Sequence, residues 1–65
     1  MTGTVKFFND SKGFGFITND ETGKDIFVHR NNLGPGLNTL REGQEVILRI
    51  VQGQRGPEAR DVRLA

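Results

Sequence analysis

Alternation between aromatic and smaller residues is the feature that most constrains the fold of this chain. Residues 12–17 read Lys-Gly-Phe-Gly-Phe-Ile, so Phe14 and Phe16 stand two positions apart, as do Gly15 and Ile17. Successive side chains of a β-strand point to opposite faces, which places the two phenylalanines on one face and Gly15 with Ile17 on the other. The pattern predicts a strand with one aromatic face.

A second stretch, residues 25–29, repeats this alternation as Asp-Ile-Phe-Val-His. Ile26 and Val28 share one face, and Phe27 shares the other with His29. Aliphatic faces make the better core, so we expect Ile17 to be buried with Ile26 and Val28. The three phenylalanines then lie together outside, where aromatic rings beside cations suit stacking on unpaired nucleic-acid bases. The alternative, that these rings form an ordinary core, is weaker because the aliphatic face already supplies one.

Length and composition limit what the chain can be. Its 65 residues predict one domain, residues 1–65. A domain of this size buries only about 60% of the surface that its unfolded chain exposes, so outward-facing aromatic rings need a use. There is no cysteine and one histidine, so we expect no metal and no cofactor. No apolar run is long enough to span a membrane, and none resembles a secretory signal, so we expect a cytoplasmic protein, and a monomer.

The charge balance says little by itself about a polyanionic partner. Nine basic and eight acidic side chains leave a net charge of +1. If nucleic acid is the ligand, stacking must therefore supply much of the affinity. Lys6, Lys12 and Arg30 lie close to aromatic positions in the sequence. Four more arginines lie towards the C-terminus, and any role for them stays open.

Turn residues divide the chain into five expected strands, at residues 4–9, 12–19, 24–29, 45–51 and 58–64. Residues 30–42 are rich in Asn, Gly and Pro and break any regular element, so they form either a binding loop or a simple crossover. Apolar residues nowhere recur at helical spacing for long enough to make a helix. At this size, the pattern predicts an all-β fold in which a single sheet closes into a five-stranded antiparallel barrel.

The chain resembles the bacterial cold-shock proteins over nearly its whole length. Residues 12–17 resemble the first ribonucleoprotein motif of that family, and residues 25–29 resemble the second. The opening Val-Lys-Phe-Phe-Asn and the later Glu-Gly-Gln and Gly-Pro-Glu-Ala segments, with Val62, are similar to the family's other signatures. The resemblance implies an oligonucleotide-binding (OB-fold) barrel. It also implies a protein that binds single-stranded RNA and DNA with little sequence preference, as an RNA chaperone and regulator of transcription or translation.

Three positions depart from the family pattern. Phe7 stands where tryptophan is usual, and Arg30 and Leu37 each stand where another aromatic residue is common. A base stacked on an aromatic side chain is worth about 1–3 kcal/mol, so these changes predict weaker binding. Arg30 can recover part of the loss, since a guanidinium plane also stacks on bases.

The pattern and the resemblance together predict one nucleic-acid-binding surface. Bases would stack on phenylalanines, His29 and Arg30 would extend the stack, and Lys6 with Lys12 would contact the backbone. The phenylalanine candidates are Phe7, Phe8, Phe14, Phe16 and Phe27.

The first strand leaves one question open. Strict alternation puts Phe7 on the same face as Val5, and Phe8 on the opposite face with Lys6. A buried Val5 is compatible with an exposed Phe7 only if the strand bulges or twists between them. The sequence therefore leaves undecided which of the two phenylalanines is the more exposed.

Three rival interpretations fit the sequence less well than this surface. An enzyme is disfavoured, because Asp10, Asp20 and Asp25 lie in or beside turns and no nucleophile or second histidine accompanies them. A protein-interaction barrel that docks a partner on its aromatic surface would normally use tryptophan or tyrosine, and the chain has neither. A mixed α/β RNA-recognition fold shares the ribonucleoprotein motifs but needs two helices.

Overall fold

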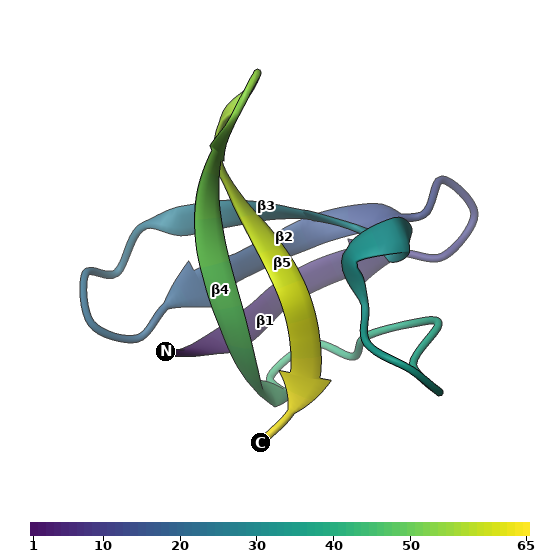
Figure 1. Ribbon diagram of the computed structural model, residues 1–65. Helices are drawn as coiled ribbons and strands as arrows, with labels where there is room; N and C mark the ends of the chain where they lie inside the picture. Colours follow the sequence, from purple (N-terminus) through teal and green to yellow (C-terminus); the bar gives the residue numbers. More distant parts are fainter.

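The computed structural model describes residues 1–65 and contains five strands and one short helix (Figure 1). The strands are β1 (Thr2–Asn9), β2 (Phe14–Asn19), β3 (Asp25–His29), β4 (Glu45–Gly53) and β5 (Gly56–Leu64). The 3-10 helix η1 covers Arg30–Asn32, directly after β3. The strands close into a barrel in the order β1-β2-β3-β5-β4, so the predicted five-stranded barrel is confirmed. The mixed α/β alternative is excluded, since η1 is the only helix.

One junction of the barrel is parallel, where the sequence predicted antiparallel pairing throughout. β3 pairs with β5 in parallel through Phe27 and Glu58, and the other four junctions are antiparallel. The reason is geometric, because strand direction cannot alternate all the way around a ring with an odd number of strands. The one helix, η1, is a single short turn that follows β3, and no helix of the structure has the length and hydrophobicity of a membrane span.

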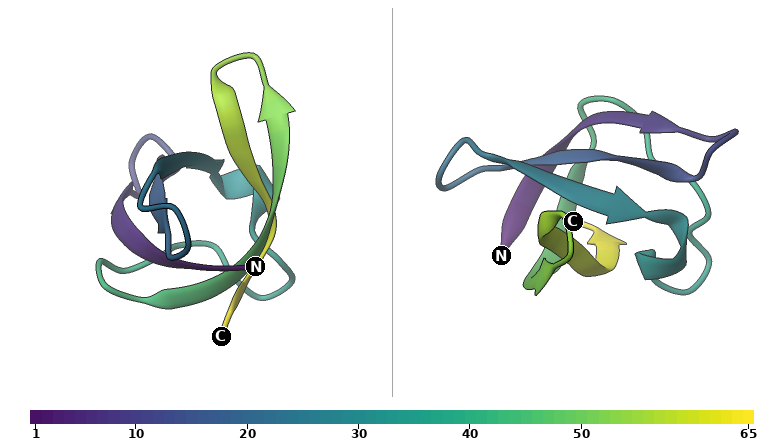
Figure 2. Two further views of the ribbon diagram at one scale, coloured as in Figure 1. Left: turned by 90° about the vertical axis from the view of Figure 1, so that its left-hand side faces the viewer. Right: turned by 90° about the horizontal axis from the view of Figure 1, so that it is seen from above.

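Strand ends differ from the predicted ones by up to two residues, and the β4–β5 turn is the largest difference. Gly53 pairs with Gly56, so only Gln54 and Arg55 form the loop, where a turn over residues 53–57 was predicted. The resulting hairpin is long and projects beyond the rest of the barrel, as the left view of Figure 2 shows.

The core confirms the predicted inward face of β2 and β3. Ile17, Ile26 and Val28 are each at most 2% exposed. The full buried cluster is aliphatic and comprises Val5, Ile17, Ile26, Val28, Leu40, Val46, Leu48, Ala59 and Val62. Ile50 is half-buried and packs at the edge of this core. Leu40 belongs to the segment for which no core role was predicted.

A bulge in β1 decides between the two adjacent phenylalanines. Val5 is opposite Ile17, but Phe7 is opposite Phe16, so the register shifts by one residue around Lys6. This shift allows Val5 to be buried while Phe7 is 38% exposed. Phe8 is half-buried and packs against the aliphatic core. The bulge that the sequence required for this outcome is therefore present.

Gly15 lets β1 and β2 approach closely beside that bulge. A Cβ atom at Gly15 would lie 2.2 Å from the carbonyl oxygen of Phe7 and 2.7 Å from the Cα of Phe8. Both are backbone atoms, so they cannot move aside without distorting β1. Any side chain at position 15 would push the two strands apart.

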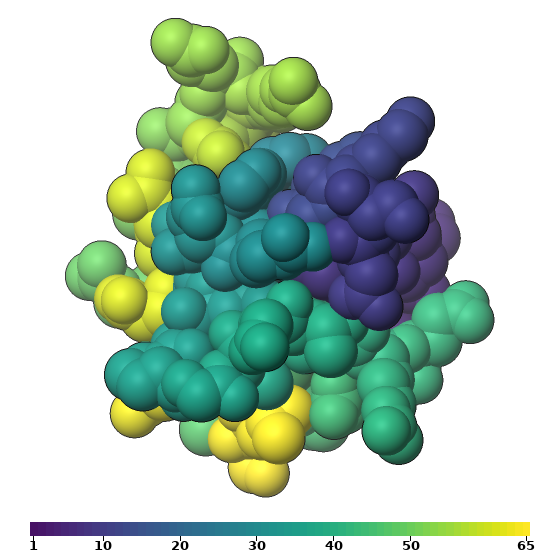
Figure 3. Space-filling model, turned by 90° about the vertical axis from the view of Figure 1, so that its right-hand side faces the viewer, coloured from purple at the N-terminus to yellow at the C-terminus, as the bar shows by residue number.

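The β3–β4 connection crosses one side of the barrel (Figure 3). Leu33 and Leu37 pack against the core, and the backbone N–H of Gly34 donates to the Val62 carbonyl at 2.7 Å. Asp10, in the β1–β2 turn, accepts a hydrogen bond from Thr39 through its carboxylate. The connection thus crosses the barrel and completes the core, and its Asn31 and Asn32 also line a groove described below.

A carboxyl pair links β1, β4 and the β2–β3 turn. Thr4 Oγ1 lies 2.8 Å from Asp20 Oδ1 and 2.9 Å from Glu45 Oε1. Hydrogen bonding with Asp20 raises the pKa of Glu45, and the same bond from protonated Glu45 lowers the pKa of Asp20. The two groups therefore favour sharing one proton as the pH falls.

We expect Gly15→Ala to lower the free energy of unfolding by at least about 3 kcal/mol, at the upper end of the cost of overpacking, because the clash is with backbone. Gly23→Ala is the matched control, since its Cβ would meet no atom within 4 Å and only its positive φ of 75° opposes the change. That control should lose about 1–2 kcal/mol. Urea unfolding of both variants measures the difference, and equal losses would contradict the close strand approach.

We expect Glu45→Gln to raise the melting temperature at pH 7, since a neutral amide beside Asp20 removes the repulsion between two carboxylates. A raised folded-state pKa means that the destabilising effect of ionised Glu45 is present above that pKa and disappears as pH falls towards the ordinary glutamate range, near about 4.3. The gain should therefore shrink between pH 7 and pH 4. Thermal melts across this range measure it. A gain that does not change with pH would show that Glu45 and Asp20 do not share a proton.

Candidate nucleic-acid interface

Four phenylalanine rings gather on the outer face of the first three strands. Phe7 comes from β1, Phe14 and Phe16 from β2, and Phe27 from β3. We call this set the aromatic platform. Phe7 is exposed and the other three are half-buried, because their strands turn the aliphatic residues inward.

The rings of the aromatic platform contact one another in a closed cycle. Phe7 lies 6.2 Å from Phe14 and 5.8 Å from Phe16, measured between ring centroids. Phe27 lies 5.9 Å from Phe14 and 5.8 Å from Phe16. Each ring is supported by two others, and such contacts are worth about 0.5–1.5 kcal/mol each beyond area burial. The platform is therefore preorganised in the absence of any ligand.

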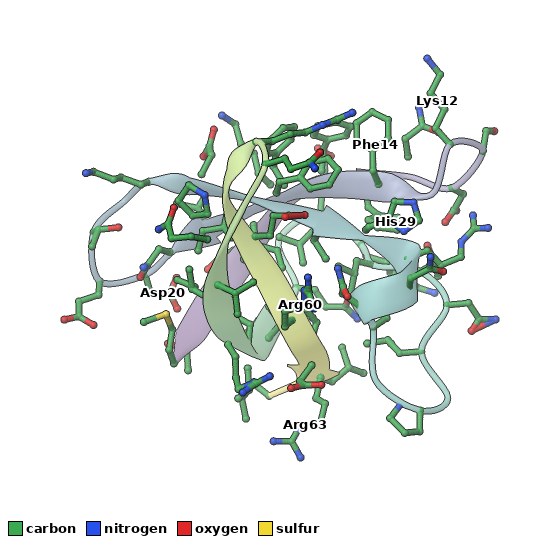
Figure 4. The ribbon with its side chains drawn as sticks, turned by 45° about the horizontal axis from the view of Figure 1, so that its top comes forward. Lys12, Phe14, Asp20, His29, Arg60 and Arg63 are labelled. Carbon is green, nitrogen blue, oxygen red and sulfur yellow. The ribbon has the colours of Figure 1, made fainter.

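A groove of about 710 Å³ runs from the platform to the β4–β5 hairpin. Phe14 and Phe27 form its apolar floor, and most of its lining is polar or cationic. We call it the platform groove, and its other lining residues are Lys12, His29, Asn31, Asn32, Gln54, Arg55, Glu58 and Arg60. Lys12, Phe14 and His29 lie towards the same end of β2 and β3 in Figure 4.

Arg55 is a member of this surface that sequence reasoning did not single out. Its guanidinium carbon lies 5.2 Å from the centroid of the Phe27 ring, within cation–π range. The residue lies in the two-residue turn of the β4–β5 hairpin, far from Phe27 in sequence. The parallel pairing of β5 with β3 brings them together, so only knowledge of that non-local junction could have identified Arg55.

His29 and Lys12 lie where the sequence predicted. His29 Nδ1 accepts a hydrogen bond from the backbone N–H of Asn31 at 3.1 Å, which caps η1. In the neutral ring the proton is then on Nε2, which remains free to donate to a ligand in the groove. Lys12 is exposed on the β1–β2 turn, and its ammonium makes no ion pair.

Three predicted residues have other contacts. Lys6 forms an ion pair with Asp25, with its Nζ 2.9 Å from the carboxylate oxygen, so its charge is partly compensated. Arg30 donates to the Asp10 carbonyl and packs near Gly13, outside the platform groove. Phe8 packs against the core and is not part of the aromatic platform.

The chemistry of the platform groove comes from aromatic rings, cations and amides. No three side chains of His, Cys, Asp or Glu come together anywhere in the molecule. Glu58 is the only carboxylate that lines the platform groove. Aromatic rings, cations and amides in an open groove are suited to binding, since they provide stacking faces and hydrogen-bond donors.

Comparison with known proteins gives one consistent result. The family model for the 'Cold-shock' DNA-binding domain matches residues 1–65. The cold shock-like protein CspLB of Listeria monocytogenes is 58% identical over 63 residues, which cover 95% of this chain and 94% of that protein. The major cold shock protein CspA of Pseudomonas aeruginosa is 54% identical over 65 residues, 98% and 93% of the two chains. The cold shock protein CspV of Vibrio cholerae is 52% identical over 63 residues, 95% and 90% of the two chains.

We expect the two adjacent phenylalanines to differ in their contribution to stability. Replacing a fully buried phenylalanine by alanine costs about 3–5 kcal/mol, so Phe8→Ala, at the core edge, should cost about 2–3 kcal/mol. Phe7→Ala removes a more exposed ring that has two ring–ring contacts, and should cost less, about 1–2 kcal/mol. Urea unfolding of the two variants makes the comparison. A larger loss for Phe7→Ala would reverse the inside and outside assignments of β1.

Proposed function

The chain belongs to the cold-shock domain family and is a nucleic-acid-binding cold-shock protein, and on that basis we propose that it binds single-stranded RNA and DNA by stacking bases on the aromatic platform. The observation that carries this proposal is the closed cycle of four phenylalanine rings, left open to solvent on the outside of a barrel with few apolar residues to spare. The family also points to a protein that is not an enzyme.

Stacking explains both features of the proposed binding, which are selectivity for unpaired strands and tolerance of any base sequence. Every base has a π-face, so a platform of rings accepts any sequence. Bases within a duplex are already stacked and paired, so the platform reaches only unpaired strands. Lys12, Arg55 and the Nε2–H of His29 surround the rings and would contact phosphates and base edges.

Binding of this kind would make the protein an RNA chaperone. A ligand that binds only the unpaired form of a hairpin shifts the equilibrium towards that form by mass action, without ATP. Weak hairpins in transcripts would open first, which gives the protein a route to influence transcription or translation. One chain supplies the whole platform, so we propose a monomer, acting in the cytoplasm where its transcripts are.

Charge should make a modest contribution to the affinity. The net charge of +1 is low for a nucleic-acid-binding protein, and Lys6 is engaged by Asp25. Each phosphate contact to a single strand contributes about −0.7 to the slope of log affinity against log salt. For a short oligonucleotide, the slope of log affinity against log salt should therefore be small, because only a few cations around the aromatic platform contact phosphates.

We expect Phe14→Ala and Phe27→Ala each to weaken binding about 5- to 150-fold, the equivalent of one stacked base, and the double variant to abolish it. Fluorescence anisotropy of labelled single-stranded RNA and DNA measures this, with duplex as the comparison ligand. A label is needed because the chain has no tryptophan or tyrosine.

Leu64→Ala is the matched control, since it removes an exposed apolar side chain away from the aromatic platform. It should leave the affinity unchanged, and circular dichroism should show that all variants remain folded. A folded double variant that binds as tightly as wild type would refute the stacking site. Absence of binding by the folded wild-type protein would favour a protein partner for the platform.

A further inference from the structure

Positive charge is concentrated on the β4–β5 hairpin. The segment from Arg49 to Arg63 carries four arginines and two acidic residues, although the whole chain is nearly neutral. Arg55 is accounted for by its position over Phe27. The other three arginines lie further along the hairpin, beyond the aromatic platform.

A second bulge directs two of these arginines outward together. Ile47 is opposite Arg63 and Arg49 is opposite Arg60, so the register shifts between them. Asp61 occupies the bulge with a φ of 52°. Strict alternation would place Arg60 and Val62 on the same face. The bulge instead buries Val62 and leaves Arg60 and Arg63 exposed.

The exposed arginines of β4 and β5 are only partly compensated by acidic residues. Arg49 and Arg60 are directly opposite each other, and like charges in that arrangement are destabilising. Asp61 pairs with Arg49, with its carboxylate oxygen 2.7 Å from the Nε of Arg49. The only other ion pair in the molecule is Lys6–Asp25, so Arg60 and Arg63 have no carboxylate partner. An anion bound beside Arg60 would relieve the repulsion between Arg60 and Arg49.

Arg60 also connects this face to the platform groove. It lines the groove together with His29, Arg55 and the asparagines of η1. Figure 4 shows Arg60 beside the middle of β5, and Arg63 pointing away from the barrel near the end of the same strand. Along a strand, these positions are on the order of 10 Å apart. A strand of nucleic acid that leaves the groove at Arg60 and follows β5 towards its C-terminal end passes Asp61 and then reaches Arg63.

We propose that a single strand bound to the aromatic platform continues across the groove and along the outer face of β5, where Arg60 and Arg63 contact its backbone phosphates. This inference depends on the proposed single-strand binding and adds a second, electrostatic segment to it. Stacking would hold the first nucleotides, and the two arginines would hold the following ones without reading their bases. Affinity should then rise again with oligonucleotide length after the platform is full.

The experiment measures salt-dependent affinity for a length series. Homopolymeric single strands of about 4 to about 16 nucleotides span the site sizes of such barrels. For the longest strands, we expect Arg60→Gln and Arg63→Gln each to reduce the salt slope by about 0.7. The wild-type advantage should therefore fall about 2.6-fold for each fourfold rise in salt. For the shortest strands, which fill only the aromatic platform, Arg63→Gln should bind like wild type, because Arg63 does not line the platform groove.

Arg41→Gln is the matched control, because it removes the same charge from an exposed arginine that lines no groove. It should leave the length dependence and slope unchanged. If wild type, Arg60→Gln and Arg63→Gln have the same salt slope on long strands, the proposed path along β5 is wrong. The path is also wrong if Arg41→Gln reduces the salt slope as much as these two variants do. If short strands bind normally in either case, the aromatic platform stands and only the inference fails. If wild type binds no strand of any length, the proposed function itself fails.

Discussion

Burial of one aliphatic face determines the arrangement of this molecule. Ile17, Ile26 and Val28 fill the barrel interior, and the two-residue period of β2 and β3 then leaves the alternate positions outside. Phe14, Phe16 and Phe27 occupy three of those positions. A chain of 65 residues has few apolar side chains to leave uncovered, so the same pairing that builds the core also creates the exposed aromatic surface.

Two irregularities redirect side chains that a regular strand would misplace. The β1 bulge lets Val5 enter the core while Phe7 joins the rings outside. The β5 bulge at Asp61 buries Val62 and turns Arg60 outward. In both strands the extra residue, Lys6 or Asp61, is charged, and its side chain is exposed to solvent. Both bulges thus leave an exposed side chain, Phe7 or Arg60, two positions from a buried valine.

Local pattern was enough to predict the features that depend on one strand or on adjacent strands. Alternation gave the core residues of β2 and β3, and the conflict around Phe7 indicated the β1 bulge before its geometry was known. Features that depend on contacts between distant parts of the chain could not be predicted from the sequence. Arg55 meets Phe27 only through the β3–β5 junction, and Leu40 enters the core from an irregular segment with no periodicity to reveal it. Likewise, nothing in the sequence showed that Arg30 would turn to the Asp10 carbonyl.

The parallel junction has a consequence for the link between binding and stability. β3 and β5 share one residue pair, Phe27 with Glu58, and beyond β3 only the Leu33–Val62 bridge continues the contact. This junction, which we call the seam of the barrel, has the fewest paired residues. The platform groove lies over it, with Phe27 on one side and Arg55 on the other. A strand of nucleic acid that contacts both Phe27 and Arg55 would bridge the seam. Binding would then stabilise the barrel against opening at the junction with the least strand pairing.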